Sequence, residues 1–303
     1  MVTRIEFRLM TEADIPLGMR LKAQAHWNQT EADWQRFLRL QPDGCFVARC
    51  NGQDVGTTTV CMFGSVAWIA MVLVDSEHRH RGIGTRLVQH ALDFLDRHRV
   101  ATVRLDATAL GRPVYERLGF VGQYELMRME GEISDGGIPW LPRRAEPQRI
   151  EEMTLGKARV HAIEPMGQRG LDAIERRDRL ATRTPRGKLL ARLIAESASR
   201  GYLTTGLDST GGYVLSRRGA QAVQLGPAVA SDEVCGRVLL DRAAADWTGQ
   251  RVYIDVPVDN HAAVRWAEDR GLACQRSFVR MVRGQPVSDD LQRLWASSGP
   301  EKG

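Results

Sequence analysis

The sequence predicts a mixed α/β (α+β) protein built from two similar domains in tandem. Its 303 residues fit two domains of ordinary size, because single domains commonly span roughly 100–200 residues. Segments with the two-residue alternation of strands are interspersed with segments of helical periodicity, which is typical of layered α/β structures. The second half of the chain also repeats features of the first half in the same order and at the same spacing.

In the first half, the apolar periodicity assigns each element in turn. The predicted strands cover residues 5–9, 45–49, 54–62, 66–74, 101–107 and 121–129, and the predicted helices cover 12–25, 31–40, 82–98 and 112–118. Thr30 is a candidate N-cap for the second helix, and Asn51-Gly52 is a strong turn signal between two strands. On the third helix, Ile83, Leu87, Ala91 and Leu95 recur every four residues and form an apolar stripe.

An internal repeat and a segment rich in glycine and proline divide the chain. At an offset of 152 residues, Gly84 falls on Gly236, Gly119 falls on Gly271, and residues 108–120 fall on 260–272, which indicates a duplication. Residues 131–149 hold three glycines and three prolines, which break helices and strands. We therefore predict a first domain over residues 1–130, a linker over 131–157 and a second domain over 158–303, whose residues 288–303 form a short helix and a tail.

Composition excludes several classes of protein. The longest apolar run, residues 66–74, is nine residues long, far short of the ~20 needed to span a membrane. The N-terminus has no apolar stretch of signal-peptide length, so we expect a cytoplasmic protein. The five cysteines are odd in number and form no C-x-x-C pair, which argues against a disulfide framework or a zinc site and favours core positions: Cys45, Cys50, Cys61, Cys235 and Cys274.

The charge balance points to an anionic ligand and not to nucleic acid. The net charge is +5, and only four of the 42 basic residues are lysines. An excess of positive charge favours binding of anions. Nucleic-acid binding would call for a dense basic run with interleaved aromatic residues, which the sequence lacks.

The motif that carries chemistry lies at residues 72–86, VLVDSEHRHRGIGTR. An apolar strand ends there, and Arg79-x-x-Gly82-x-Gly84 opens a helix. Glycines allow close approach of the backbone to a ligand, and a helix N-terminus offers unpaired N–H groups with a positive dipole end. With the neighbouring arginines, these parts form a pyrophosphate site. The loop is neither a Walker motif nor a full dinucleotide fingerprint, because Leu87 stands where a third glycine is needed.

About thirty residues after this loop, residues 107–120 read ATALGRPVYERLGF. A strand that leads into Tyr-Glu-Arg-Leu-Gly-Phe after a phosphate-binding loop resembles the GNAT superfamily of N-acetyltransferases. The stretches AHWNQTEADWQRFLRLQPDGCFVA and LDATALGRPVYERLGF resemble a tandem-GNAT subset with a divergent C-terminal acetyltransferase-like domain. The resemblance implies that each domain has a mixed, mostly antiparallel twisted sheet with a splayed central strand pair, flanked by helices. It also implies acetyl-CoA as cosubstrate and no metal.

The resemblance also implies roles for individual residues. The splayed strand, Val72, Leu73 and Val74, would pair with the pantetheine arm, and Thr108 stands where the family often has an asparagine that contacts it. Tyr115 matches the tyrosine that protonates the leaving thiolate. The pyrophosphate would be held by Arg79, His80, Arg81, Gly82, Ile83, Gly84, Thr85 and Arg86. His78 and His80 lack a third ligand, so we expect no metal site.

The general base and the acceptor site are less determined. By residue type, His26, Glu125 and Asp75 are candidates for the base. His26 is taken as the catalytic candidate because it lies between the first two helices, which shape the acceptor pocket in this family. Candidates for acceptor binding are Trp27 and Asn28 in the first domain and, in the second, Arg217, Arg218, Asp255 and Asn260, of which we take Asp255.

The second copy of the motif has lost its chemical groups. At the same offset, Arg79-His80-Arg81 becomes Ser231-Asp232-Glu233, and Tyr115 becomes Ala267. Ser231 is a good N-cap, and the two carboxylates would satisfy the helix dipole and repel a phosphate. We therefore expect the first domain to be active and the second to be structural or to shape the acceptor site.

Together these features predict an N-acetyltransferase that moves an acetyl group from acetyl-CoA to a primary amine of a small molecule by direct attack in a ternary complex. Two alternatives are a non-catalytic acyl-CoA-binding or sensor protein and an acetyltransferase acting on a protein amine. We expect neither nucleic acid nor a membrane as partner, and a monomer or homodimer.

Overall fold

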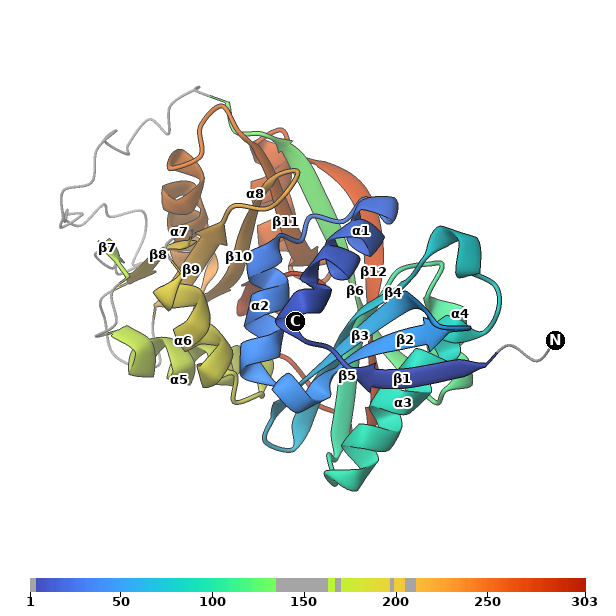
Figure 1. Ribbon diagram of the computed structural model, residues 1–303. Coiled ribbons are helices and arrows are strands. Elements are labelled where there is room, and N and C mark those ends of the chain that lie inside the picture. Colours follow the sequence, from blue (N-terminus) through green and yellow to red (C-terminus); the bar gives the residue numbers. More distant parts are fainter. Residues whose placement is uncertain (1–3, 135–162, 167–169, 197–198, 205–210) are drawn as a thin grey trace.

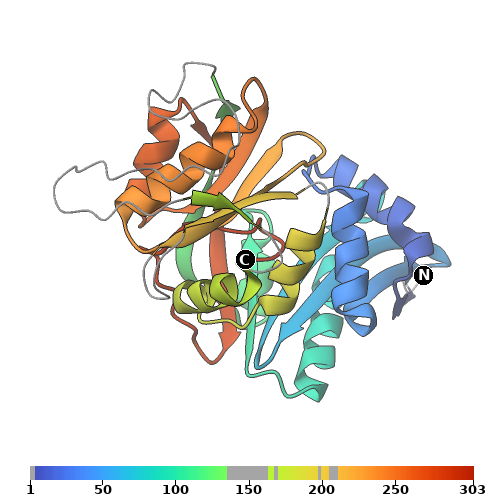
Figure 2. The same cartoon turned by 90° about the vertical axis from the view of Figure 1, so that its left-hand side faces the viewer.

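One continuous sheet runs through both halves of the protein. The computed structural model describes residues 4–134, 163–166, 170–196, 199–204 and 211–303 (Figures 1 and 2). Its thirteen strands follow the order β1-β2-β3-β4-β5-β12-β6-β11-β10-β9-β8-β7, with β13 paired to β10. Helices cover both faces of the sheet. Alternate residues of β2 show this: Cys45 and Val47 pack against the helices α1 and α2 on one face, and Phe46 and Ala48 pack against α3 on the other.

The elements of the first half lie close to the predicted ranges. The strands are β1 (Ile5–Leu9), β2 (Cys45–Cys50), β3 (Gln53–Phe63), β4 (Val66–Val74), β5 (Thr102–Ala107) and β6 (Val121–Glu132), and the helices are α1 (Ile15–Gln24), α2 (Glu31–Leu40), α3 (Ile83–Arg97) and α4 (Arg112–Arg117). Thr30 caps α2 in a reciprocal arrangement with Asp33, as predicted. Asn51 and Gly52 adopt positive φ angles of 48° and 86° in the turn between β2 and β3, which explains the turn signal.

The second half has the same order of elements. Its strands are β7 (Ile163–Pro165), β8 (Ser199–Thr204), β9 (Gly212–Arg217), β10 (Val223–Ala230), β11 (Arg251–Pro257), β12 (Ala273–Gly284) and β13 (Leu294–Ala296), and its helices are α5 (Leu171–Thr182), α6 (Gly187–Ala195), α7 (Glu233–Ala245) and α8 (His261–Asp269). Strand β12 begins and ends 152 residues after β6. The predicted offset is therefore confirmed by the strand bounds themselves.

The two halves exchange their long final strands. Strand β12 lies between β5 and β6, and β6 lies between β12 and β11, so each half receives a strand from the other. Leu126 pairs with Phe278 in the antiparallel register, and these residues are themselves 152 apart, which places a pseudo-two-fold axis between them. The sequence predicted a separate sheet for each domain. Periodicity cannot distinguish the two arrangements, because an exchanged strand keeps the same alternation and the same ladder of hydrogen bonds.

The exchange also affects the predicted domain limits. Strand β6 runs to Glu132, two residues past the predicted end of the first domain. Residues 135–157 of the predicted linker lie outside the described residues. The limits at 130 and 158 therefore stay a prediction.

The C-terminal segment differs from the prediction. The helix expected within residues 288–303 is wrong: residues 294–296 form β13, which pairs with β10, and Trp295 is buried against Gly236. Residues 297–303 then fold back between the two halves. There, the Lys302 ammonium donates to the Asp33 carboxylate on α2 at 3.0 Å. Buried apolar side chains at three successive positions suit a strand covered on both faces better than a one-sided surface helix.

Four of the five cysteines are buried, as predicted, and Cys274 is exposed at the start of β12. Cys274 lies at a strand end, where alternation places side chains on the solvent face as readily as in the core. Within the described part of the chain, no helix is long and apolar enough to cross a membrane.

The exchange predicts that the two halves unfold together. Leu126 is fully buried on the pseudo-two-fold axis. We expect Leu126→Ala to lower the free energy of unfolding by about 2–5 kcal/mol, with one cooperative urea transition detected by both tryptophan fluorescence and circular dichroism. Val121→Ala on the same strand is the control, since Val121 is 62% exposed and should change stability by less than about 0.5 kcal/mol. Two separated transitions would contradict the shared sheet.

Candidate active site

A gap opens between β4 and β5 in the first half. These parallel strands pair only where residues 66–68 meet 102–104. Beyond Trp68, β5 stays paired with β12 while β4 diverges, and Met71 adopts a positive φ of 50° within a bulge against β3. The β5-facing backbone edge of β4 from Ile69 to Val74 therefore has no strand partner among the described residues. This is the splayed pair expected at Val72, Leu73 and Val74, and the free edge can hydrogen-bond an extended ligand.

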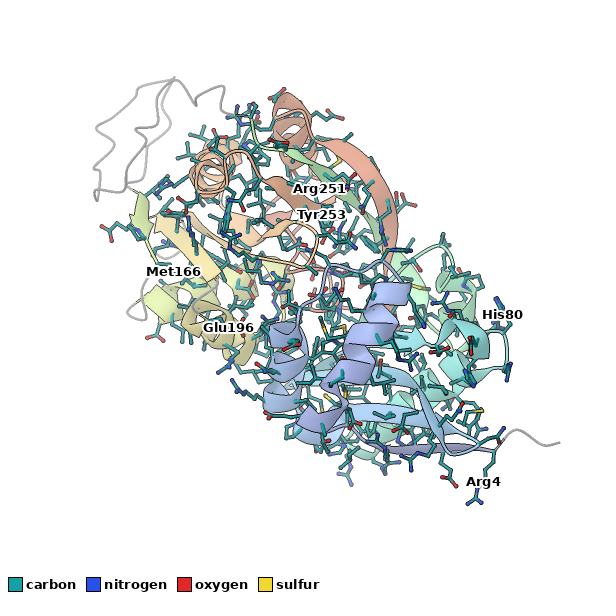
Figure 3. The ribbon with its side chains drawn as sticks, turned by 45° about the horizontal axis from the view of Figure 1, so that its top comes forward. Arg4, His80, Met166, Glu196, Arg251 and Tyr253 are labelled. Atoms are coloured by element: carbon teal, nitrogen blue, oxygen red, sulfur yellow. The ribbon has the colours of Figure 1, made fainter. Side chains whose placement is uncertain are left out.

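The loop after β4 leads directly into the N-terminus of α3. His80 and Gly82 have positive φ angles of 61° and 75°, and His80 lies at the outer edge of the molecule (Figure 3). Gly82 is the N-cap residue and offers no side chain to the first amides of α3. Arg79 donates to the Val74 carbonyl at 3.1 Å, and Arg81 donates to the Glu77 carbonyl at 2.9 Å. An uncapped helix N-terminus flanked by arginines is a site for an anion such as a phosphate.

One predicted loop residue points elsewhere. The Arg86 guanidinium donates to the Ile5 carbonyl at 3.2 Å and lies 5.7 Å from the centre of the Phe7 ring. It therefore packs against β1, whereas Arg79 and Arg81 lie in the loop itself.

In the second half, the equivalents of the α3 N-terminus and of the gap between β4 and β5 are both occupied by residues of the protein. Asp232 caps α7, and its carboxylate accepts a hydrogen bond from the Cys235 amide at 2.9 Å. Strands β10 and β11 also diverge after three paired residues, but there β13 pairs with β10. The second half thus has neither an uncapped helix N-terminus nor an open gap between its strands at these positions.

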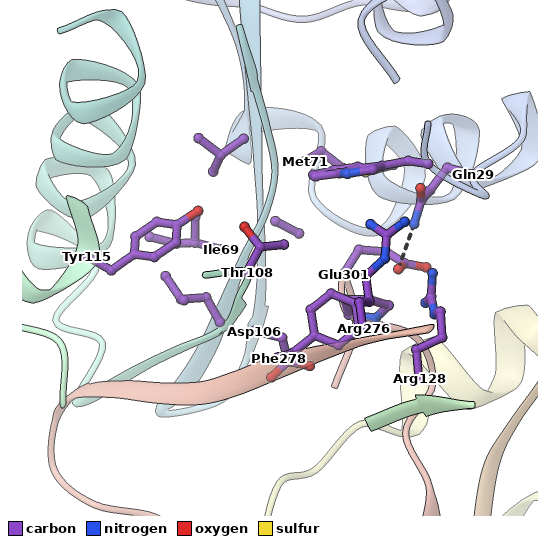
Figure 4. A pocket seen from close by; sticks show the side chains of 15 residues that line it. Gln29, Ile69, Met71, Asp106, Thr108, Tyr115, Arg128, Arg276, Phe278 and Glu301 are labelled. Atoms are coloured by element: carbon purple, nitrogen blue, oxygen red, sulfur yellow. Dashed lines mark hydrogen bonds between the residues drawn. The ribbon is translucent and has the colours of Figure 1, made fainter. Parts of the chain in front are cut away.

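A pocket lies beside the gap in the first half (Figure 4). Its volume, including its open mouth, is about 510 Å³. It is lined from both halves: by Trp27 and Gln29, by β4, β5, β6 and β12, by Thr108 and α4, and by the tail. Trp27, Val72, Thr108 and Tyr115 from the predicted set line it. Tyr115 and Thr108 lie at one end, and Arg128, Arg276 and Glu301 lie at the other.

Tyr115 is partly buried, and it lines the pocket. Its ring packs against Phe120, with 6.0 Å between ring centres, and among the described residues its hydroxyl has no hydrogen-bond partner. Burial raises the pKa of Tyr115 to about 12. The hydroxyl therefore keeps its proton at neutral pH and reaches the pocket unpaired.

The three candidates for the general base do not line the pocket. His26 is exposed in the turn after α1, and Glu125 is exposed on β6. Asp75 is buried at the end of β4. Burial alone would raise the pKa of Asp75, but hydrogen bonds from Arg20, the Glu77 amide and Gln24 lower it to about 2. Asp75 thus anchors the loop to α1 as a carboxylate.

Two residues predicted to bind the acceptor instead hold the halves together. The Asn28 side chain accepts from the amides of Gln221 and Ala222 at 2.8 and 3.0 Å and donates to the Ala222 carbonyl at 3.0 Å. Asp255 forms a buried bidentate ion pair with Arg128 at 2.7 and 2.9 Å. The polar atoms of these side chains are already paired and neither residue lines the pocket, so a part for them in acceptor binding stays a prediction without structural support.

The other polar residues considered in the second half also have structural partners. Asn260 caps α8 and donates to the Leu294 carbonyl at 3.0 Å, and Arg217 donates to the tail at Ser298 and Glu301. Arg218 stacks over Trp247, with its guanidinium carbon 5.1 Å from the ring centre.

The sequence did not single out most of the residues that line the pocket, among them Asp106, Arg128, Arg276, Phe278 and Glu301. The first four lie on β5, β6 and β12. Charged residues within apolar strands could have indicated a buried polar site. These side chains come together only through the strand exchange, which the sequence does not reveal. Asp106, for example, is buried by β12 and accepts from Arg280 at 2.7 and 2.8 Å. Burial raises the pKa of Asp106, and Arg280 opposes that shift.

Two family models match the chain in tandem. A model described as the GNAT acetyltransferase family matches residues 12–120, and one described as a GNAT acetyltransferase domain matches residues 174–296. The uncharacterized N-acetyltransferase YitH of Bacillus subtilis is 32% identical over 104 residues, which cover 34% of this chain and only 36% of YitH. The N-alpha-acetyltransferase MAK3 of Arabidopsis thaliana is 28% identical over 145 residues, which cover 42% of this chain and 75% of MAK3.

Solved structures share the arrangement of both halves. A proposed acetyltransferase from Pyrococcus horikoshii superposes with a TM-score of 0.78 at 21% identity, over 99% of this chain and 96% of that one. A tandem GNAT protein from the clavulanic acid biosynthesis pathway gives a TM-score of 0.60 at 15% identity, over 94% of this chain and 100% of that one. At these identities the likeness concerns the fold.

The hydrogen bonds of Asn28 to the second half predict that removing its side chain lowers the stability of the protein. Asn28→Ala would leave the buried amide of Ala222 and the partly buried amide of Gln221 without acceptors. We expect the free energy of unfolding to fall by about 1–3 kcal/mol, measured by urea denaturation. Arg39→Ala, at an exposed position of α2, is the control and should change stability by less than about 0.5 kcal/mol. An Asn28→Ala protein of unchanged stability would contradict the structural role.

Proposed function

Because the chain belongs to the GNAT superfamily of acetyltransferases, we propose that its first half is an acetyl-CoA-dependent N-acetyltransferase that acts on a primary amine of a small molecule. One observation carries this proposal. The first half combines an uncapped helix N-terminus, a free strand edge and a pocket with an unpaired tyrosine, whereas the second half has filled the first two positions.

The residues of the first half fit coenzyme A. The first amides of α3, with Arg79 and Arg81, would hold the pyrophosphate, and the free edge of β4 would pair with the pantetheine arm. Acetyl-CoA supplies the acetyl group as a thioester. A Cβ atom built at Gly82 would have open space around it, but its φ of 75° disfavours any other residue, so the backbone conformation itself explains this glycine.

Groups of the protein itself can assist the transfer of the acetyl group. The acceptor amine attacks the thioester carbonyl, a C–N bond forms, and the C–S bond breaks. The nitrogen releases one proton to solvent water, and solvent water restores the proton of Tyr115 after each turnover. The leaving sulfur takes up a proton, which the Tyr115 hydroxyl at this end of the pocket can donate. The backbone amides along the free edge of β4 can stabilise negative charge on the carbonyl oxygen.

The second half closes the acceptor side. Strand β12 and the tail supply Arg276, Phe278, Pro300 and Glu301 to the pocket wall. A pocket walled by a second domain suits a small acceptor better than a polypeptide, which needs an open groove. The named activity of MAK3 keeps a protein amine as the second candidate acceptor. A non-catalytic acyl-CoA sensor is disfavoured, because a sensor has no need of an unpaired tyrosine in the pocket.

Binding of acetyl-CoA is the first test. Calorimetric titration should give one site per chain, and Arg81→Glu should weaken binding by about tenfold or more, because it replaces a cation that faces the pyrophosphate. Arg97→Glu, an exposed position at the other end of α3, is the matched control and should bind normally. Two equivalent sites would contradict the inactive second half. No binding by the folded protein would contradict the proposal as a whole.

The role of Tyr115 predicts a catalytic loss without loss of binding. With the best acceptor of a small-amine panel, Tyr115→Phe should lower kcat by roughly 10²–10⁴, measured by thiol release, while the Kd for acetyl-CoA stays within about twofold. Because the pKa of Tyr115 is raised to about 12, its hydroxyl stays protonated through pH 10, and the ratio of wild-type to variant rates should stay constant from pH 7 to 10. Wild-type turnover by the variant would remove Tyr115 from the mechanism.

A further inference from the structure

Two arginines face each other across the exchanged strands at one end of the pocket. Arg128 on β6 and Arg276 on β12 are direct register partners, and both line the pocket. Figure 4 shows the Arg276 side chain reaching toward the side where Met71 and Gln29 lie. Like charges directly opposite each other on paired strands are destabilising, so this pair needs a compensating partner.

Of these two arginines, only Arg128 is paired with a carboxylate. Arg128 is 4% exposed and uses Nε and Nη2 for the ion pair with Asp255, and its Nη1 has no hydrogen-bond partner among the described residues. Arg276 donates Nε to Gln275 at 3.0 Å, and its two terminal nitrogens likewise have no partner in the described part of the chain. Burial and the charge of Arg128 lower the pKa of Arg276.

The carboxylates near this end of the pocket already have cations of their own. Glu301 accepts from Gln29 at 2.9 Å and from Arg217 and Lys302, and Asp106 is paired with Arg280. Glu130, on the strand of Arg128, is paired with Arg251 at 2.8 Å. Arg276 is therefore the unbalanced charge among the described residues that line the pocket.

The pseudo-two-fold axis provides an internal comparison. The equivalent of the Arg128–Arg276 pair is the register pair Arg280–Tyr124. There the arginine pairs with Asp106, and Tyr124 bonds both Arg280, at 2.6 Å, and Asp289, which closes the cluster. At the equivalent place beside the pocket, Arg276 stands where the other pair has Tyr124, and no carboxylate among the described residues bonds to it.

We propose that the acceptor amine carries a carboxylate, which Arg276 binds together with the free Nη1 of Arg128. This inference rests on the proposed acetyltransferase function and names its substrate class. One surplus positive charge matches a monoanion such as a carboxylate better than a phosphate dianion, and the guanidinium fork suits the two carboxylate oxygens. Tyr115 lies at the other end of the pocket, so the amine and the carboxylate belong at opposite ends of a small molecule.

Matched pairs of amines test this inference. Thiol release from acetyl-CoA is measured with 4-aminobutanoate against n-butylamine and with L-lysine against 1,5-diaminopentane. We expect at least one carboxylate-bearing member to exceed its partner in kcat/KM by about tenfold or more. Arg276→Gln should raise the KM for that member by about tenfold to a hundredfold, with little change in its kcat, in the partner amine or in the Kd for acetyl-CoA.

Arg283→Gln is the matched control, because Arg283 lies on the same strand, is paired with Asp96 and does not line the pocket. Arg276→Lys, which keeps the charge but loses the fork, should retain part of the preference. A preference for the amines without a carboxylate, or one that survives Arg276→Gln, would overturn the inference. So would a panel in which no carboxylate-bearing amine is turned over while acetyl-CoA still binds. Loss of acetyl-CoA binding by the wild-type protein would instead overturn the proposed function.

Discussion

The antiparallel pairing of β6 with β12 is the interaction on which the rest of this structure depends. It joins two half-sheets into one and brings β5 and β11 to its two sides. Each outer strand then supplies an aspartate to an arginine of the exchanged pair: Asp106 to Arg280, and Asp255 to Arg128. Such buried pairs contribute little net stability, but removing one partner commonly costs about 3–5 kcal/mol, so they penalise any other register.

The same pairing makes the pocket a joint product of both halves. The guanidinium groups of Arg104 and Arg280 both contact the ring of Trp68 on β4, at 5.1 and 4.8 Å from its centre, so the splayed strand of one half packs against a residue of the other. The tail adds a second connection, since Glu301 and Lys302 bond to Gln29 and Asp33. The pocket wall is thus held by side chains that the first 130 residues do not contain.

Much of the fold could be predicted because it is encoded locally. The Thr30 cap, the Asn51-Gly52 turn and the apolar stripe of α3 are set by neighbouring residues, and all were correct. The glycine-containing loop before α3 was placed correctly for the same reason, while its binding of a phosphate stays a prediction. What failed depends on contacts distant in sequence: the exchange of β6 and β12, the insertion of β13 beside β10, and the pairing of Asn28 with residues 221–222. Residue type and spacing cannot reveal that a polar side chain already has partners in the other half.

The scarcity of lysine has a consequence for a protein that we propose to hold a reactive thioester. A lysine amine becomes a nucleophile when it loses its proton, whereas an arginine guanidinium stays protonated at all working pH values. Of the three lysines that the structure describes, Lys22 and Lys302 are buried, and Lys188 donates its ammonium to the Leu40 carbonyl at 3.1 Å. If the proposed function holds, a described surface that draws its positive charge from arginine would attract an anionic acyl donor and would offer few amines that could be acetylated by mistake.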